Sequence, residues 1–147
     1  MSIAPVIVWF RQDLRLHDNP ALYHAARTGK PILPVFILDD ANAGDRAPGA
    51  AARWWLHHSL HSLDHNLDNH LIIKQGNARA IVPELIAQSG ADAIYWNRCY
   101  EPWRIERDTA IKNQLKNERI AVHTYNGTLL YEPWNCLKDD GTPYMVF

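Results

Sequence analysis

Val6–Leu22, VIVWFRQDLRLHDNPAL, is the stretch that decides the fold of this chain. Its first five residues, Val6–Phe10, are all apolar or aromatic, and a continuous run of this kind is typical of a strand covered on both faces. Asn19 and Pro20 then predict a helix start, with an N-cap side chain followed by proline at the first helical position. Strand, polar loop and helix in this order indicate an α/β domain. The loop is more charged than a turn requires, because it contains Arg11, Asp13, Arg15, His17 and Asp18.

The same alternation continues along the rest of the chain. Further strands rich in β-branched and aromatic residues are predicted at Ile32–Leu38, Leu71–Lys74, Ala93–Trp96 and Ile120–Thr124. Helical segments separate the strands at residues 19–29, 49–68, 77–89 and 102–118. Five strands joined by four helices predict a single doubly wound, Rossmann-like α/β domain with a five-stranded parallel sheet.

The composition limits the class of protein. The 147 residues include 15 basic and 16 acidic side chains, so no overall basic field attracts nucleic acid. Two cysteines, Cys99 and Cys136, are too few for a disulfide framework or a zinc site. No apolar run approaches the roughly 20 residues that span a bilayer, and the N-terminus lacks the basic segment of a signal peptide. We therefore expect a cytoplasmic protein without a membrane partner.

Ligands of an open parallel sheet bind beyond the carboxyl ends of its strands. Two loops predicted at this edge are rich in functional side chains, RQDLRLHDN after the first strand and NRCYEPWRIERD after the fourth. The last helix has one face made of Arg104, Arg107 or Asp108, Ile111 and Leu115. Since buried charges need partners, its charged half either pairs with a group such as Asp13 or binds a polar ligand. The alternative for both loops is a solvated rim.

Other chemistry-bearing motifs are missing or weak. The chain has no G-x-G-x-x-G after its first strand, no P-loop and no G-x-S-x-G. Four histidines crowd the second helix: His57, His58, His61 and His65. They lie opposite the leucine stripe from Leu56 to Leu67, so we expect them to face solvent and predict no metal site. The residues by themselves lead to a ligand-binding α/β domain of unknown ligand.

The segment VWFRQDLRLHDNPAL resembles the N-terminal signature of the DNA photolyase and cryptochrome family. The resemblance continues in GAAARWWLHHSLHSLDHNL, in LIIKQGNARAIVPELIAQSGADAIYWNRCYEPWRIERD and in the closing GTPYMVF. It covers nearly the whole chain in the family's order, and it implies the family's α/β antenna domain, in agreement with the predicted sheet. We expect this domain over residues 1–130 and the start of a linker over residues 131–147.

The resemblance also implies a larger parent protein, a deoxyribodipyrimidine photolyase, which is a carbon–carbon lyase. Family members continue into a helical domain that binds FAD and a pyrimidine dimer flipped out of the duplex. An antenna chromophore passes light energy to reduced FAD, which donates an electron that splits the dimer. The present chain is then expected to be a fragment without catalytic residues. Its implied partners are that helical domain and, through it, damaged DNA.

An antenna chromophore is the cofactor that the resemblance implies for this domain. Members that bind a reduced folate can carry an Asn-Glu pair just after the YE element, where this sequence has Trp103 and Arg104. A deazaflavin or flavin is therefore favoured, with a reduced folate as the alternative. Such a ligand requires apolar walls and a few polar groups. The candidate pocket residues are Phe10, Arg11, Asp39, Arg53, Asn97, Cys99, Glu101, Trp103 and Arg104, with Phe10 and Trp103 stacking on the rings. Arg15, His17 and Asp18 are assigned to the turn and the helix cap, and Asp13 fits either role.

Three other interpretations stay open. A cryptochrome-type blue-light receptor has the same N-terminal domain, and the difference lies in the helical domain. An adenine-nucleotide-binding α/β module shares the sheet but requires a glycine-rich phosphate loop, which the sequence lacks. A purely structural half-domain binds nothing until it docks on its helical partner, and an exposed apolar patch on the docking side would favour it.

Overall fold

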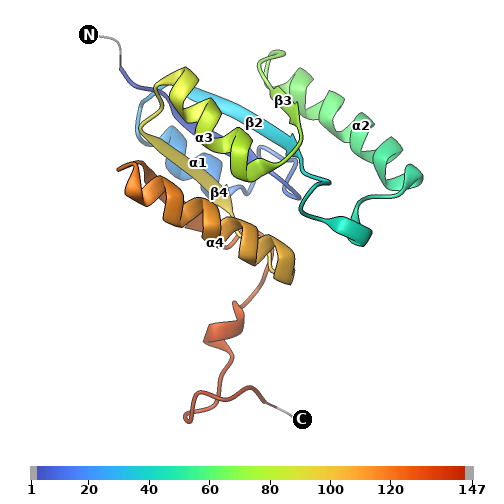
Figure 1. The fold of residues 1–147 in the computed structure, drawn as a ribbon, viewed down its shortest axis with the longest axis vertical. Helices are drawn as coiled ribbons and strands as arrows, with labels where there is room; N and C mark the ends of the chain where they lie inside the picture. Colours follow the sequence, from blue (N-terminus) through green and yellow to red (C-terminus); the bar gives the residue numbers. More distant parts are fainter. Residues whose placement is uncertain (1–2, 145–147) are drawn as a thin grey trace.

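The computed structural model describes residues 3–144 and has an alternating order of strands and helices (Figure 1). The elements are β1 (Val6–Phe10), α1 (Pro20–Ala26), β2 (Ile32–Leu38), η1 (Gly44–Arg46), α2 (Ala50–Asn66), β3 (Ile72–Gln75), α3 (Ala78–Ser89), β4 (Ala93–Asn97), α4 (Pro102–Asn117), β5 (Ala121–Tyr125) and η2 (Pro133–Asn135). All strand pairs are parallel, and the strand order is β3-β2-β1-β4-β5. The predicted five-stranded, doubly wound α/β sheet is confirmed.

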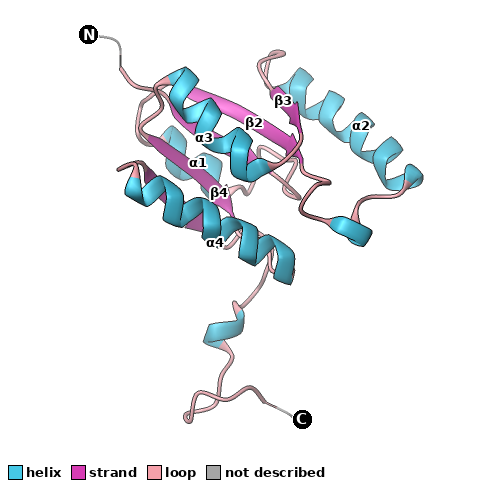
Figure 2. Cartoon of the chain, in the orientation of Figure 1, coloured by secondary structure: helices cyan, strands magenta, loops and turns pink. Residues whose placement is uncertain are grey.

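Two apolar clusters hold the helices on the sheet. Helices α3 and α4 lie on one face and α1 lies on the other, as Figure 2 shows. Ile7 and Trp9 of β1 belong to the cluster under α3 and α4. Phe10, with the neighbouring even-numbered residues of β1, packs with residues of α1 and with Leu63 of α2. Because successive side chains of a strand point to opposite faces, β1 supplies both clusters.

The observed strands match the predicted ranges closely. Val6–Phe10 and Ile32–Leu38 coincide with the prediction, β4 ends one residue later than predicted, and β3 and β5 are each shifted by one residue toward the C-terminus. β1 and β4 are buried at every residue, whereas β3 and β5 at the sheet edges are largely exposed or half-buried. Continuous burial therefore holds for the centre of the sheet and not for its edges, since an edge strand has a neighbour on one side only.

Local signals account for where the helices begin and end. The Asn19 side chain accepts a hydrogen bond from the Leu22 N–H at 3.2 Å, and Pro20 occupies the first turn of α1. Asn77 caps α3 in the same way, with the Arg79 N–H at 2.9 Å. Gly90 ends α3 in the left-handed conformation at φ 67°, which glycine adopts at little cost.

Helix α2 has the two faces that its sequence predicts. Leu60 and Leu63 are buried, Leu56 and Leu67 are half-buried, and the four histidines of the helix are exposed. Within residues 3–144, no group of three or more His, Cys, Asp or Glu side chains is arranged to hold a metal ion. Over the same described range, no helix is long and apolar enough to cross a membrane.

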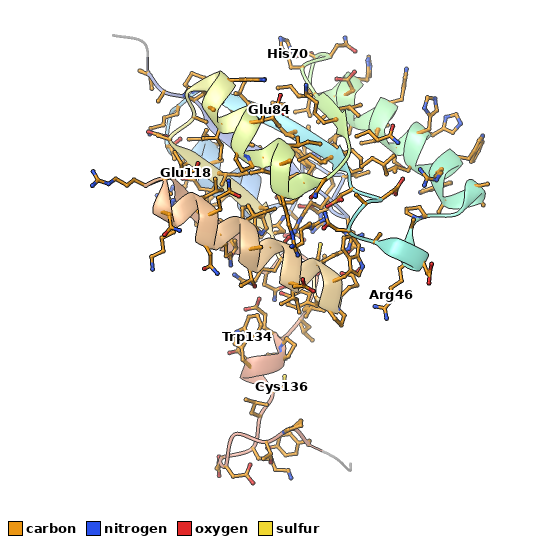
Figure 3. The ribbon with its side chains drawn as sticks, in the orientation of Figure 1. Arg46, His70, Glu84, Glu118, Trp134 and Cys136 are labelled. Carbon is orange, nitrogen blue, oxygen red and sulfur yellow. The ribbon has the colours of Figure 1, made fainter. Side chains whose placement is uncertain are left out.

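The chain leaves the sheet after β5 as an extended segment. Trp134 and Cys136 lie on this segment, away from the layers of the sheet (Figure 3). Glu132 anchors it to the end of β4, because its carboxylate accepts hydrogen bonds from Arg98 Nε at 2.6 Å and from the Tyr100 hydroxyl at 2.7 Å. The domain boundary at residue 130 stays a prediction, and residues 145–147 of the expected linker lie outside the described residues.

Candidate functional site

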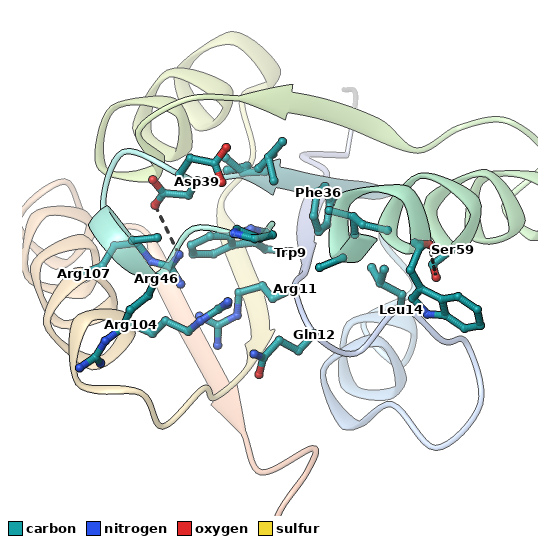
Figure 4. Close-up of a pocket in the computed structure, with 18 of the residues that line it drawn as sticks. Trp9, Arg11, Gln12, Leu14, Phe36, Asp39, Arg46, Ser59, Arg104 and Arg107 are labelled. Atoms are coloured by element: carbon teal, nitrogen blue, oxygen red, sulfur yellow. Dashed lines mark hydrogen bonds and ion pairs between the residues drawn. The ribbon is translucent and has the colours of Figure 1, made fainter. Parts of the chain in front are cut away.

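A cleft of about 520 Å³ lies beyond the carboxyl ends of β1 and β2, between α2 and the start of α4. Its aromatic wall residues are Trp9, Phe36, Trp55 and Trp103. Its charged wall residues are five arginines and two aspartates: Arg11, Arg15, Arg46, Arg104, Arg107, Asp39 and Asp40. Figure 4 shows Arg11, Arg46, Arg104 and Arg107 gathered around Trp9 at one end, and Phe36 with Leu14 and Ser59 at the other. The cleft therefore has a cationic end and an apolar end.

A buried ion cluster forms the floor at the cationic end. Arg107 donates to Asp108 Oδ1 from Nε at 3.0 Å and from Nη2 at 2.9 Å, and its Nη1 lies 3.4 Å from Asp39 Oδ2. Arg11 pairs with the second oxygen of Asp108 and also donates to the Asn97 carbonyl. All four charged side chains are nearly inaccessible to solvent. The charged half of α4 is thus paired, as buried charges require, and its partners are Asp39 and Arg11.

Asp13 belongs to a second network behind the cleft. It accepts hydrogen bonds from the Arg11 N–H at 2.8 Å and from Asn97 Nδ2 at 2.6 Å. Asn97 also donates to Asn19 Oδ1 at 2.8 Å and accepts from the Ala21 N–H at 3.1 Å. These bonds join the loop after β1, the end of β4 and the start of α1. Asp13 therefore fixes the backbone of the site and does not line it.

The charged loop after β1 is divided between these two networks and the turn. Arg15 donates to the Asp18 carbonyl at 3.2 and 2.9 Å and to the Gly127 carbonyl at 2.7 Å. Asp18 has a positive φ of 48°, and both Asp18 and His17 are exposed. Arg15 thus stabilises the turn before α1, as predicted from the sequence, but it also lines the cleft, which the sequence analysis did not predict.

Four of the nine predicted pocket residues line the cleft, namely Arg11, Asp39, Trp103 and Arg104. Phe10 does not, because it is fully buried in the cluster on the opposite face of the sheet, and Trp9 takes its place in the wall. Arg53 also lies off the wall, where it donates to Asp40 Oδ2 at 2.7 Å and to the Pro48 carbonyl at 2.9 Å. It supports the loop that carries Asp40.

The other three predicted residues support the site from behind. Asn97 is occupied by the network with Asp13. Cys99 is buried, and burial raises the pKa of its thiol. Glu101 stands at the N-cap of α4 and accepts a hydrogen bond from Gln12 Nε2 at 2.8 Å. Burial alone would raise the pKa of Glu101, but hydrogen bonds, including that from Gln12, together with the nearby Arg104 hold it below its usual range. The ligand-binding role of all nine residues stays a prediction.

Sequence reasoning missed several wall residues: Trp9, Phe36, Arg46 and Trp55. Trp9 and Phe36 belong to strands buried on both faces, where the pattern does not show which face a side chain takes. Trp55 directly precedes the leucine stripe of α2, and this position on the helix was a signal in the sequence from which a place in the cleft wall could have been predicted. Arg46 lies in the short η1 helix, whose path no sequence pattern predicts.

Comparison with known proteins places the chain in a family. The family model described as DNA photolyase matches residues 6–147. The chain is 42% identical to a deoxyribodipyrimidine photo-lyase of Agrobacterium fabrum, over 100% of this chain and 31% of that protein. It is 40% identical to cryptochrome-2 of Arabidopsis thaliana, over 96% of this chain and 24% of that protein. The chain thus spans less than a third of the length of these relatives.

Solved structures agree with the sequence matches. A bacterial class III photolyase from Agrobacterium tumefaciens superposes with a TM-score of 0.89 at 41% identity, over 99% of this chain and 30% of that one. An archaeal photolyase from Sulfolobus tokodaii with two FAD molecules gives a TM-score of 0.79 at 31% identity, over 88% and 31% of the two chains. Sequence, topology and the matched range agree, and this chain therefore belongs to the photolyase/cryptochrome family, of which it forms the N-terminal α/β domain.

Proposed function

We propose that this chain is the light-harvesting domain of a DNA photolyase and that the cleft holds its antenna chromophore. The observation that carries the proposal is the cleft itself, with three tryptophans in its wall and arginines gathered at one end. Its volume of about 520 Å³ falls in the range of small-molecule sites, roughly 300–1,000 Å³. Its position beyond the strand ends is where doubly wound sheets bind ligands.

The residues of the cleft fit a flat aromatic ligand with an anionic tail. The rings of Trp55 and Trp103 offer stacking surfaces, and the guanidiniums of Arg46 and Arg104 are available to carboxylate or phosphate groups. The chain holds and orients the ligand and shields it from water, while the chromophore supplies the absorption of near-UV or blue light when bound. We favour a flavin or a deazaflavin, in keeping with the second FAD of the archaeal relative. Trp103 and Arg104 replace the Asn-Glu pair that the resemblance associates with folate.

The activity of the longer protein follows from its relatives. Photolyases are among these relatives, and we propose that a full-length form repairs cyclobutane pyrimidine dimers with light and reduced FAD in a further helical domain. A blue-light receptor is the second candidate, because two cryptochromes of Arabidopsis thaliana are 40% and 39% identical to this chain. A measurement of dimer repair by the longer protein under blue light separates the two candidates, because repair is expected of a photolyase and not of a blue-light receptor.

A binding titration of the purified chain tests the antenna proposal. FMN, a deazaflavin and a reduced folate are each followed by absorbance and fluorescence. We expect saturable binding of FMN or the deazaflavin. Trp103→Ala should weaken that binding by about tenfold, because the loss of a stacking contact costs about 1 kcal/mol or more. Trp134→Ala is the matched control, since Trp134 is exposed on the segment after β5 and lies off the cleft wall, and it should bind as the unaltered chain does. Absence of binding by all three compounds would refute the proposal.

A further inference from the structure

Three tryptophans around the ion cluster each carry cations over their rings. The guanidinium carbon of Arg107 lies 4.9 Å from the ring centre of Trp9 and 5.1 Å from that of Trp103. Arg104 lies 4.6 Å from the ring centre of Trp103. Trp9 and Trp96 meet edge to face with their ring centres 5.5 Å apart. Two of the three indoles, Trp9 and Trp103, line the cleft.

Further cations cover the pair formed by Trp9 and Trp96. Arg11 lies 5.1 Å from the ring centre of Trp9 and 5.8 Å from that of Trp96. The ammonium of Lys112 lies 5.9 Å from the ring centre of Trp96. The carboxylates that balance the arginines bind the guanidiniums. They do not accept hydrogen bonds from Trp9 or Trp96, whose Nε1 atoms are buried without a hydrogen-bond partner in the described chain. Each of the three rings therefore lies against a guanidinium or an ammonium, and the N–H groups of Trp9 and Trp96 have no adjacent base.

This environment opposes the oxidation of tryptophan. An indole beside an excited flavin-type ligand can lose one electron to it; the ligand is then reduced by one electron, the indole becomes a radical cation, and no bond is broken. A cation at 5 Å destabilises that radical cation by Coulomb repulsion. An oxidised indole is normally stabilised when its N–H proton passes to a base, and the buried N–H groups of Trp9 and Trp96 have none.

We propose that the cations over these rings, above all Arg104 and Arg107, keep Trp9 and Trp103 from donating an electron to the excited ligand. The inference rests on the proposed antenna function and adds a role for the arginines beyond binding. Electron transfer from an adjacent indole would end the excited state before its energy reaches another pigment. A tryptophan under a guanidinium supplies the stacking surface of an aromatic wall without quenching the excited state by electron transfer.

Arg104 offers the cleanest test, because its side chain is partly exposed and pairs with Glu101 at 3.4 Å, outside the buried cluster with Asp108. Trp55, which is 69% exposed and has no cation over its ring among the described residues, is replaced by phenylalanine throughout so that it does not contribute. FMN is the probe, and the fluorescence lifetime of its bound form is measured, since this quantity does not depend on occupancy. Arg104→Met removes the charge, and Arg104→Lys retains a charge on a side chain of matched length.

We expect the quenching rate of bound FMN to be about tenfold higher in Arg104→Met than in Arg104→Lys, as the loss of a nearby unit charge predicts. Adding Trp103→Phe to Arg104→Met should restore the longer lifetime. Equal lifetimes in the two Arg104 variants would overturn the inference, and so would a shortened lifetime that Trp103→Phe fails to restore.

A second measurement needs no bound ligand and separates this inference from the antenna proposal. Azide radicals, which are uncharged one-electron oxidants, are generated by radiolysis, and oxidation at Trp103 itself is located by tandem mass spectrometry, so that oxidation of the methionine introduced in Arg104→Met is not counted. We expect several times more oxidation of Trp103 in Arg104→Met than in Arg104→Lys, because only lysine retains the positive charge over the ring. Met and Lys are of similar length, so the difference is not caused by a loss of cover over the ring. Equal oxidation would overturn the inference. Failure of FMN, the deazaflavin and the reduced folate to bind would refute the antenna function and leave this test decisive.

Discussion

Replacement of Asp108 by asparagine should destabilise the domain more than any surface substitution. Asp108 is 7% exposed and balances two guanidiniums, those of Arg11 and Arg107, which are 6% and 2% exposed. Asparagine keeps the shape but loses the charge, and Asp39 remains as the one carboxylate paired with Arg107. Removing one partner of a buried ion pair costs about 3–5 kcal/mol, a large part of the roughly 5–15 kcal/mol that a domain has. For a chain of this length the unfolding midpoint should fall by about 6–20 °C.

Thermal and urea unfolding, followed by circular dichroism, measure this loss. Asp45→Asn is the matched control, because Asp45 is exposed in η1 and forms no ion pair in the described structure. It should change the free energy of unfolding by less than about 0.5 kcal/mol. A loss of less than about 1 kcal/mol for Asp108→Asn would show that the buried pairs contribute no more than surface ones, and the account of the cluster would fail.

Three further predictions follow from local geometry. Gly127→Ala should cost about 1–3 kcal/mol in urea unfolding, because a Cβ there would lie 2.6 Å from Cγ of the buried Asn97; an unchanged midpoint would contradict the close approach. Leu63→Ala should lower the free energy of unfolding by about 2–5 kcal/mol, because its side chain is buried. Leu130→Ala, at a side chain 91% exposed, should change it by less than about 0.5 kcal/mol. Equal effects of the two substitutions would refute the burial assigned to α2. Burial would raise the pKa of Glu132, but hydrogen bonds from Arg98 and Tyr100 lower it below its usual range. Its contribution of about 1 kcal/mol is therefore present above the ordinary glutamate pKa of about 4.3 and is lost as the pH falls through the lowered value. Glu132→Gln should accordingly be less stable than the unaltered chain at pH 7 and equally stable at pH 2, and a pH-independent difference would contradict this.

Local patterns in the sequence were enough to locate the elements of the sheet. The apolar run Val6–Phe10 becomes β1, and Asn19 followed by Pro20 becomes a capped helix start, because these signals act between residues that are close in the chain. The same reasoning placed the charged half of α4 at the carboxyl edge of the sheet, where the cleft lies. It named Asp13 as a partner, but Asp13 instead binds Asn97, 84 residues away in the chain. Pairs at such separations depend on strand order, which no local pattern contains.

The sequence by itself thus determined the α/β alternation, the strands and the edge of the sheet at which the cleft lies. Tertiary structure alone decided which side chains form the cleft. Phe10 and Trp9 are neighbours in a strand buried on both faces, and their pattern is the same whichever one faces the cleft. The packing of α4 over the odd-numbered residues of β1 settled the choice, since it placed Trp9 beside Arg107 and left Phe10 in the core under α1. The two-residue period of a strand ensures that neighbouring side chains point to opposite faces of the sheet. Only the packing of the helix layers determines which of the two faces borders the cleft.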